Sequence, residues 1–415
     1  MSGSRTMLLV AMMLAARAAG AQTPAPPVPS PSPAPSPSPA ASPAPTPEPP
    51  AVKVVPYGVV MFNGFRNSDG VNNQDVPTWV VGGPGDVSAT ARQTRFGLRA
   101  TVPPVFGAKT SAVVETDFFG GFPTIGTGEN FGQVRLRLAN ARLDWAHTSL
   151  VIGQDWMVFA PVNPTSLASA AIPLFAAGGN PWARIPQLRV DWRGGLFLLQ
   201  AAALAPQSGD FNSTFLAQPN SGAFSEQPYL QGRVALTSAS WLGSKRPGAI
   251  GVSGHYGQSR LGASQPQPKD LPSNGVAVDV NFPIGRHLAL SGEAYTGENL
   301  GGFQAGVFQG LNPDAPGGAR AIATQGAWAQ LTIAPSGWRL SATAAFGIDD
   351  PDDDDLVSTP ARNWRLENRV AAFGLTFRAS AQLSFGAELR LMETEFFSTG
   401  TQEGSHFNLA GTLSF

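Results

Sequence analysis

The sequence predicts an all-β protein: a 16-stranded antiparallel transmembrane β-barrel with an inward-folded third loop. Polar and apolar residues alternate with a period of two from Ala51 to the last residue. No run after the N-terminus approaches the ~20 continuous apolar residues of a membrane helix. Charged residues make up 13% of the chain and hydrophobic residues 42%, so the chain is poor in charge for a soluble enzyme. The apolar content is therefore dispersed over many short segments.

The N-terminus has the pattern of a secretory signal peptide over residues 1–21. Arg5 precedes the apolar run Met7 to Ala16, and Ala19-Gly20-Ala21 supplies a cleavage site of small residues. A transmembrane anchor would need a longer span without Arg17. We expect export through the inner membrane.

Residues 22–52 are predicted to be a disordered periplasmic linker. Proline at nearly every second position removes backbone donors and fixes φ, so neither helix nor sheet can form. The remaining residues, 53–415, form the predicted transmembrane barrel domain.

Residues 95–102 give the clearest strand. Arg95, Gly97, Arg99 and Thr101 fall on one face, and the residues between them are apolar. Near Ala139 the polar phase changes from odd to even positions, which indicates a β-bulge. Sixteen strand segments are expected, beginning near Val55, Arg92, Lys109, Gln133, Ser149, Arg184, Gly195, Tyr229, Pro247, Gly275, Arg286, Ala321, Gly337, Arg365, Ala381 and Gly404.

The connections alternate between brief turns and long loops. Short turns alternating with long loops are typical of an up-and-down membrane barrel with periplasmic turns and external loops. The long polar loops are expected at 67–91, 206–228, 258–274, 299–320 and 349–363.

The final strand, GSHFNLAGTLSF, places Phe407, Leu409, Leu413 and Phe415 on one face. In water this face would be an aggregation hazard. In lipid it is the outward face of a closing strand that pairs with the first strand.

If lipid covers one face, the polar face lines a lumen and determines which solutes pass. Arginine is prominent on that face, and guanidinium groups bind carboxylate or phosphate in a bidentate fork. The alternative is an Arg/Asp network that only braces the wall. The candidate pore-lining and substrate-binding residues are Arg95, Arg99, Glu115, Asp117, Arg135, Arg137, Arg142, Asp144, Arg189, Asp191 and Arg193.

Residues 156–182 are unusually apolar for an exposed loop, with breakers at Pro173 and Pro181. We expect this third loop to fold into the lumen as a constriction. A docking surface for a neighbouring subunit is the alternative.

The acidic run from Asp349 to Asp355 falls in an expected outer loop. It lacks the glycine and terminal glutamate of an EF-hand loop, so we interpret it as a solvated negative loop. Divalent cations that bridge lipopolysaccharide are the alternative.

Other features exclude classes of function. The chain has no cysteine, four isolated histidines and no catalytic motif, so no enzyme activity, metal site or cofactor is expected. The net charge is −1 and no Lys/Arg-rich run is present, which argues against nucleic-acid binding.

Four ordered segments resemble the N-terminal half of the DcaP-type porins: RQTRFGLRA, VVETDFFGG, VRLRLANARLDW and VIGQDWMVFAP. The resemblance implies a homotrimeric 16-stranded outer-membrane channel of a Gram-negative cell for small, often anionic solutes. It also implies that Arg95, Arg99, Arg135 and Arg137 face the pore. The terminal Phe415 resembles the signature that the barrel-assembly machinery recognises. A proline-rich spacer stands where such porins can carry a helical extension.

The leading hypothesis is an outer-membrane porin for passive diffusion of small hydrophilic, anionic solutes through an Arg-lined constriction. The alternative is a plugged barrel that acts as a structural or adhesive anchor. A barrel hydrolase would need His255 or His406 beside a nucleophile.

Overall fold

A computed structural model describes residues 52–121, 132–207, 219–241, 243–262, 268–335, 337–358 and 362–415. Residues 50–415 form one compact unit. The predicted signal peptide and residues 22–51 of the predicted linker lie outside the described residues. Across the described ranges, no helix is long and apolar enough to cross a membrane.

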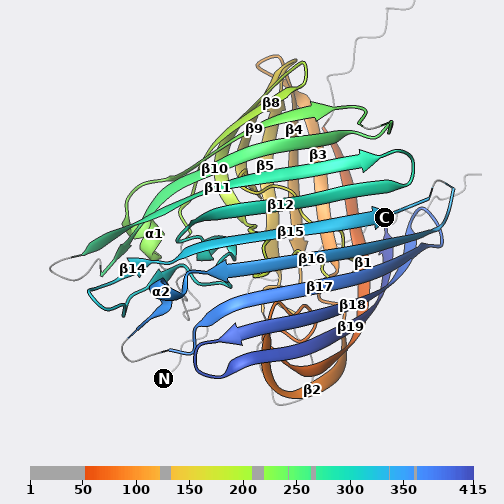
Figure 1. The fold of residues 1–415 in the computed structure, drawn as a ribbon. Helices are drawn as coiled ribbons and strands as arrows, with labels where there is room; N and C mark the ends of the chain where they lie inside the picture. The colour runs from red at the N-terminus through yellow and green to blue at the C-terminus, as the bar shows by residue number, and fades with distance from the viewer. Residues whose placement is uncertain are drawn as a thin grey trace, which may run out of the picture. The chain divides into compact units, whose positions relative to one another are not determined.

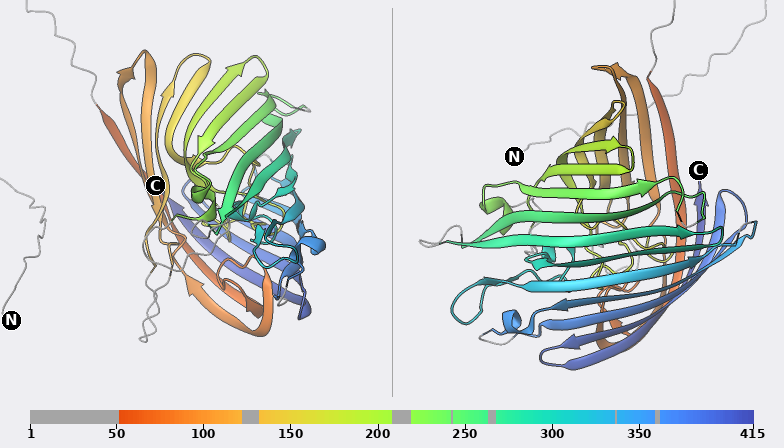
Figure 2. Two further views of the ribbon diagram at one scale, coloured as in Figure 1. Left: turned by 90° about the vertical axis from the view of Figure 1, so that its left-hand side faces the viewer. Right: turned by 45° about the horizontal axis from the view of Figure 1, so that its top comes forward.

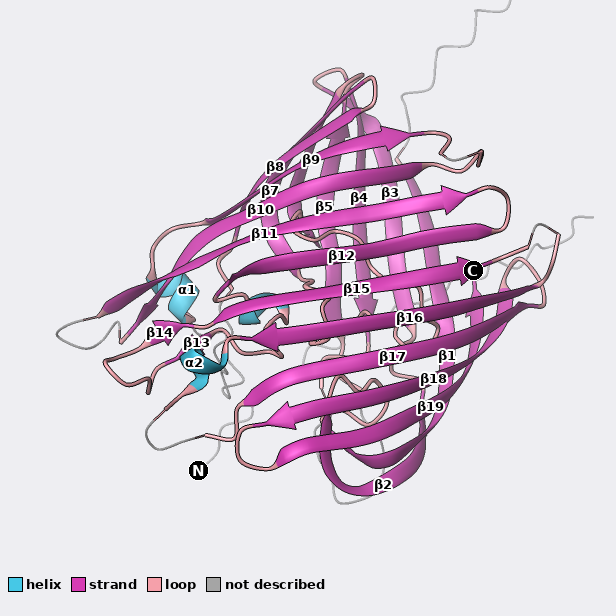
Figure 3. Cartoon of the chain, viewed as in Figure 1, coloured by secondary structure: helices cyan, strands magenta, loops and turns pink. Residues whose placement is uncertain are grey.

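The regular structure of the described chain is almost entirely antiparallel β-sheet, and its helices are short (Figures 1 and 3). Consecutive strands are neighbours in the sheet, and β1 also pairs with β19, so the sheet closes on itself. The strands of this sheet are β1 (Lys53–Val71), β2 (Val80–Thr90), β3 (Arg95–Val105), β4 (Ala108–Asp117), β5 (Arg135–Asp144), β6 (Thr148–Trp156), β7 (Arg184–Gly194), β8 (Phe197–Leu204), β9 (Tyr229–Ser238), β10 (Gly248–Leu261), β11 (Lys269–Ile284), β12 (Leu288–Glu298), β15 (Ala323–Ile333), β16 (Leu340–Pro351), β17 (Arg365–Arg378), β18 (Leu383–Phe396) and β19 (Gly400–Ser414). The remaining elements are α1 (Ser221–Phe224), η1 (Gly301–Phe303), β13 (Leu311–Asn312), β14 (Arg320–Ala321) and α2 (Asp353–Leu356).

β2 and β3 are two parts of one interrupted strand. Both pair with β1 in one continuous antiparallel order, with Thr90 opposite Asn63 and Arg95 opposite Val59. Counted as one strand, they turn the seventeen strands of the sheet into a closed sixteen-stranded barrel. The predicted all-β class and the closed sixteen-stranded antiparallel barrel are confirmed.

The predicted polar loop at 67–91 is wrong. β1 continues to Val71 and pairs with β2, so only residues 72–79 connect the two strands. β2 contains Gly82, Gly83 and Gly85, and its sequence lacks the alternation of apolar and polar residues. Backbone pairing alone makes it a strand, and a hydropathy pattern does not detect that.

The long hairpins explain why other predicted loops are also too long. β10 and β11 remain paired as far as Leu261 and Lys269, where 258–274 was expected to be loop. Arg260 and Asp270 form an ion pair of 2.7 Å at this end. Figure 2 shows the strands extending as long tilted hairpins. Where both faces of a strand are polar, the period-two signal disappears.

The two faces of the strands differ in burial. On β9, Leu230, Val234 and Leu236 are exposed, whereas Gln231 and Arg233 are buried. Exposed apolar residues alternate with buried polar residues on the other strands as well. The outer surface of the barrel is therefore apolar and its inner side polar. An exposed apolar belt of this kind is stable against lipid tails.

The predicted bulge is present two residues earlier than expected. In the β4–β5 pair the register jumps between Glu115 opposite Leu138 and Thr116 opposite Leu136. Arg137 is therefore the extra residue on β5. Because of the bulge, the odd-numbered Arg135 and Arg137 and the later even-numbered polar residues of β5 all lie on the inner side of the barrel.

Phe415 closes the barrel beside β1 and β3. Its backbone nitrogen and oxygen each hydrogen-bond Gly58 at 3.1 Å. Its ring centroid lies 6.0 Å from that of Phe96. The last strand thus has no free edge along its pairing with β1.

Candidate pore wall and the β6–β7 segment

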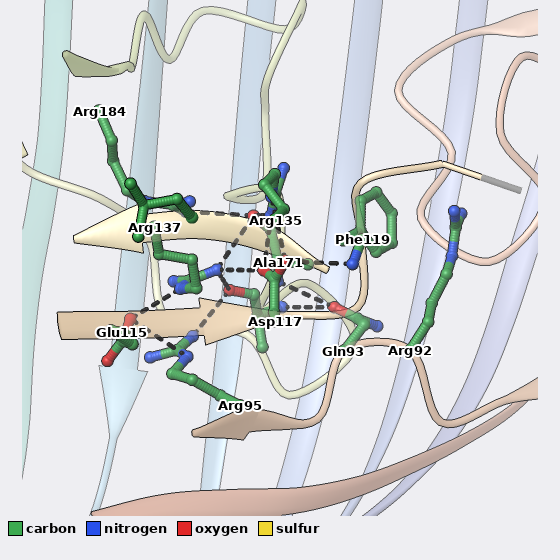
Figure 4. Close-up of polar contacts among 12 residues, drawn as sticks. Arg92, Gln93, Arg95, Glu115, Asp117, Phe119, Arg135, Arg137, Ala171 and Arg184 are labelled. Carbon is green, nitrogen blue, oxygen red and sulfur yellow. Dashed lines mark hydrogen bonds and ion pairs between the residues drawn. The ribbon is translucent and has the colours of Figure 1, made fainter. Parts of the chain in front are cut away.

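Two buried carboxylates organise the first group of predicted site residues (Figure 4). Asp117 on β4 accepts Nη2 of Arg135 at 2.7 Å and Nη1 of Arg137 at 2.8 Å. Glu115 accepts Nε of Arg137 at 2.7 Å, and Nε of Arg95 lies 3.6 Å from it. The bulge on β5 brings Arg137 between the two carboxylates. The structure therefore brings five of the predicted residues together.

Arg184, at the start of β7, joins this group and was not predicted. Its guanidinium lies over the rings of Trp156 and Trp182, at 4.4 and 5.0 Å from their centroids. The odd-numbered residues of β7 were assigned to the lumen, and Arg184 is even-numbered, so the alternation hid it. Arg95, Arg135, Arg137 and Arg184, with Glu115 and Asp117, are called the arginine cluster below.

A second group is balanced in charge. Arg142 contacts Asp144 at 2.8 Å and Asp191 at 3.4 Å. Arg189 contacts Asp191 at 3.1 Å and Asp155 at 3.0 Å. Asp155, at the end of β6, was not predicted. Arg142, Asp144, Asp155, Arg189, Asp191 and Arg193, whose Nη2 lies 3.8 Å from Asp191, are called the balanced network.

Arg99 lies outside both groups. Its guanidinium is 4.1 Å from the ring centroid of Tyr57. The Tyr57 hydroxyl donates to Glu115 at 3.0 Å, so the contact with the arginine cluster is indirect.

The β6–β7 segment, residues 157–183, is hydrogen-bonded to the polar inner face of many strands. Gln231 on β9 accepts the amides of Val158 and Phe159 at 2.9 and 3.0 Å. Further side chains that bind its backbone are Ser253 on β10, Glu293 on β12, Gln330 on β15, Asn63 on β1 and Gln93 between β2 and β3. These partners follow the strand order from β9 round to β1. Side chains of the wall thus satisfy part of the backbone polar groups of the segment.

Apolar contacts hold the β6–β7 segment at two places. Residues 157–160 pack with Tyr229, Leu300 and Phe303 in one buried cluster. Leu174 and Phe175 pack in another, with residues of β15 to β18. Residues 156–182 are unusually apolar for an exposed loop because many of their apolar side chains are buried.

The arginine cluster converges on the carbonyl groups of Ala170 and of Ala171, the latter labelled in Figure 4. The carbonyl oxygen of Ala171 accepts Arg135 at 2.8 Å, Arg184 at 3.1 Å and Arg137 at 3.5 Å. The carbonyl of Ala170 accepts Nη2 of Arg95 at 3.0 Å. Carbonyl oxygens are neutral acceptors, so these contacts leave the positive charge uncompensated.

The arginine cluster has four cations and two carboxylates, a surplus of two positive charges. Nε of Arg95, Nε of Arg184 and Nε1 of Trp182 are buried, and the described residues offer them no hydrogen-bond partner. Unpaired buried donors are costly. Such a site is suited to an anionic ligand with several oxygen acceptors.

The acidic run is partly structural, which corrects its interpretation as a solvated loop. Asp349 belongs to β16, is fully buried and accepts the amides of Gly306 and Val307 at 3.1 and 3.0 Å. Asp355 accepts the amide of Ala323 at 2.9 Å. Within the described ranges, no group of three or more His, Asp or Glu side chains could hold a metal ion.

The two histidines considered for hydrolysis contact neutral groups. Nε2 of His255 lies 3.0 Å from Oγ of Ser273. Nδ1 of His406 lies 2.7 Å from Oδ1 of Asn67. Both side chains are buried on the inner side of the sheet.

The closed barrel, its apolar outer belt and its polar inner side are the fold of outer-membrane porins, and comparison with solved structures agrees. The outer-membrane channel DcaP of Acinetobacter baumannii is similar at 20% identity and a TM-score of 0.65, over 88% of this chain and 97% of that chain. An anion-selective porin from Comamonas acidovorans is similar at 14% identity and a TM-score of 0.53, over 88% and 100%. OmpF of Salmonella typhi is similar at 11% identity and a TM-score of 0.54, over 87% and 97%. The sequence matches no family model and no curated protein.

Proposed function

We propose that this protein is an outer-membrane porin of a Gram-negative cell for the passive diffusion of small hydrophilic anions. The observation that carries the proposal is the surplus positive charge of the arginine cluster where it meets the β6–β7 segment. In this proposal the segment is the constriction of a water-filled lumen. An anion that approaches the four arginines gains electrostatic energy that a cation of the same size does not.

The proposed role divides the predicted pore residues, apart from Arg99, into two sets. The arginine cluster attracts anions because its arginines outnumber its carboxylates. The balanced network, with three arginines and three carboxylates, mainly braces the wall. This distribution supports anion preference at one point of the pore and the bracing alternative elsewhere.

The proposal includes three partners besides the solutes. Lipid and lipopolysaccharide contact the exposed apolar belt, and the barrel-assembly machinery binds the strand that ends at Phe415. Three copies assemble as a homotrimer, and the signal peptide and proline-rich linker precede the barrel. Chemical cross-linking in native membranes tests the trimer.

Planar-bilayer recording of the purified chain without residues 1–21 tests the function directly. In a tenfold KCl gradient the reversal potential should have the sign of chloride preference. Cation preference would contradict the role of the arginine cluster. A folded barrel that carries no ion current would contradict the channel itself.

A plugged barrel that serves as an outer-membrane anchor remains the second candidate. It is favoured by the extensive apolar packing of the β6–β7 segment, in which Phe159 and Phe175 are both buried. This candidate predicts no current from the folded protein.

A further inference from the structure

The break between β2 and β3 places three consecutive buried side chains at the barrel wall. Arg92, Gln93 and Thr94 are each less than a tenth exposed. The Thr94 hydroxyl accepts the amide of Met61 at 3.0 Å and so replaces a missing ladder hydrogen bond of β1. Arg92 forms an ion pair with Asp75 in the β1–β2 connection. Interruptions of a strand often redirect a side chain at a functional site.

Both polar atoms of the Gln93 side-chain amide form hydrogen bonds inside the barrel. Its Oε1 accepts the amides of Ala170 and Ala171 at 2.9 and 3.0 Å. Its Nε2 donates to the carbonyl of Ala168 at 3.0 Å and to Oδ1 of Asn63 at 3.1 Å. The side chain is fully buried, so water does not compete for these bonds.

The backbone of Ala170 and Ala171 is therefore held from two sides, and the peptide group that joins these residues is bound at its N–H by Gln93 and at its carbonyl by Arg95. Gln93 binds the N–H groups of Ala170 and Ala171, and the arginine cluster binds their carbonyl groups (Figure 4). The guanidinium contacts depend on where these peptides lie. A neutral amide can fix that position without cancelling any positive charge.

We propose that Gln93 is a positioning residue for anion selection, which holds Ala170 and Ala171, called the tip of the β6–β7 segment, against the arginine cluster. The inference rests on the proposed porin function. Without Gln93 the tip moves away, the guanidinium groups lose their common carbonyl acceptors, and the geometry of the selective region is lost.

The test compares Gln93→Leu with Gln330→Leu in planar bilayers. Gln330 is a matched control because it is equally buried and makes the same kind of paired contact, with Oε1 and Nε2 bound to the backbone of Thr165 at 2.8 and 2.9 Å. Since the arginine cluster binds Ala170 and Ala171 and not Thr165, Gln330→Leu should change the reversal potential much less than Gln93→Leu does. Gln93→Leu should lower the anion-to-cation permeability ratio by about fivefold, because the electrostatic energy of an ion falls steeply with its distance from the fixed charges.

A second measurement separates positioning from general loosening. In an Arg184→Ser background the effect of Gln93→Leu on the permeability ratio should be largely lost, because the two changes act on one arrangement. The inference would be overturned if the effects of Gln93→Leu and Arg184→Ser on the permeability ratio were fully additive. It would also be overturned if Gln93→Leu left the ratio unchanged, or if Gln330→Leu changed it equally.

Folding and basic function are checked separately. Electrophoresis with and without heating shows whether each variant is a folded barrel, and Gln93→Met, of similar length, replaces the leucine variant if that one does not fold. Failure of both to fold would assign Gln93 to barrel assembly and overturn the inference. An unmodified protein without anion preference would contradict the proposed function, whereas an anion-selective protein insensitive to Gln93→Leu would contradict this inference alone.

Discussion

Nη2 of Arg184 donates a 3.1 Å hydrogen bond to the carbonyl oxygen of Ala171. This contact joins the first residue of β7 to the tip of the segment that precedes it. Arg135 shares the same oxygen at 2.8 Å. Two guanidinium groups at one neutral acceptor repel each other, and an anion would relieve that repulsion.

Replacing Arg184 should reduce anion preference. Arg184→Ser lowers the surplus of the arginine cluster from two charges to one and leaves the barrel strands intact. We expect the reversal potential in a KCl gradient to move toward zero by about half of its value, since about half of the surplus charge is removed. The matched control is Arg260→Ser. The side chain of Arg260 forms an ion pair with Asp270 at the end of the β10–β11 hairpin. An equal shift in the control would contradict a local effect of Arg184.

Replacing Arg137 should destabilise the barrel. Its side chain is 2% exposed and contacts both Glu115 and Asp117. Arg137→Leu leaves two buried carboxylates with fewer partners, which costs about 3–5 kcal/mol for a buried pair. Urea unfolding in lipid vesicles, followed by tryptophan fluorescence, measures the loss. Arg260→Leu removes an exposed pair and should cost about 0–1 kcal/mol. Similar losses in both variants would contradict the structural role of Arg137.

The acidic turn around α2 should be more stable at low pH. Burial raises the pKa of Asp353, and the carboxylates of Asp350 and Glu395 raise it further. A raised pKa in the folded state means that the folded chain binds more protons than the unfolded chain between the ordinary and the raised pKa. Stability from this group is therefore present below that window and is lost as the pH rises through it. Asp353→Asn should raise the melting temperature at pH 7 and change it little at pH 3, and a decrease at pH 7 would contradict the sign.

The strand segments could be predicted because each crosses the apolar belt with one face in lipid. That environment enforces the alternation seen at Leu230, Gln231 and Arg233. The bulge could be located for the same reason, since an extra residue at Arg137 reverses the phase. Periodicity therefore predicts the part of the wall that lies in the apolar belt, but it misses β2 and the polar end of the β10–β11 hairpin.

The site could be predicted only in part because its assembly depends on the course of the β6–β7 segment. Alternation identified Arg95, Arg135 and Arg137 as inward residues. It could not show that Arg184, out of phase at a strand end, reaches the same carbonyl oxygen. Gln93 was hidden by the break between β2 and β3, where the strand pattern is interrupted.

Closure of the barrel at Gly58 should require a residue without a side chain. A Cβ at Gly58 would lie 2.5 Å from the carbonyl oxygen of Arg95 and 2.7 Å from the ring of Phe415. The Arg95 oxygen belongs to the paired backbone of β3, so Gly58→Val must shift the β1–β3 pairing as well as the Phe415 ring, at a cost of about 1–3 kcal/mol. We expect a lower yield of folded barrel in lipid vesicles and a lower urea midpoint.

Gly64→Val is the control on the same strand. A Cβ there meets only the ring of Phe62, at 3.6 and 3.8 Å, which is ordinary contact. This variant should fold with nearly the yield of the unmodified chain. Equal yields for the two valine variants would show that the packing of Phe415 against Gly58 does not limit closure of the barrel. The two substitutions differ mainly in the space available to the new side chain.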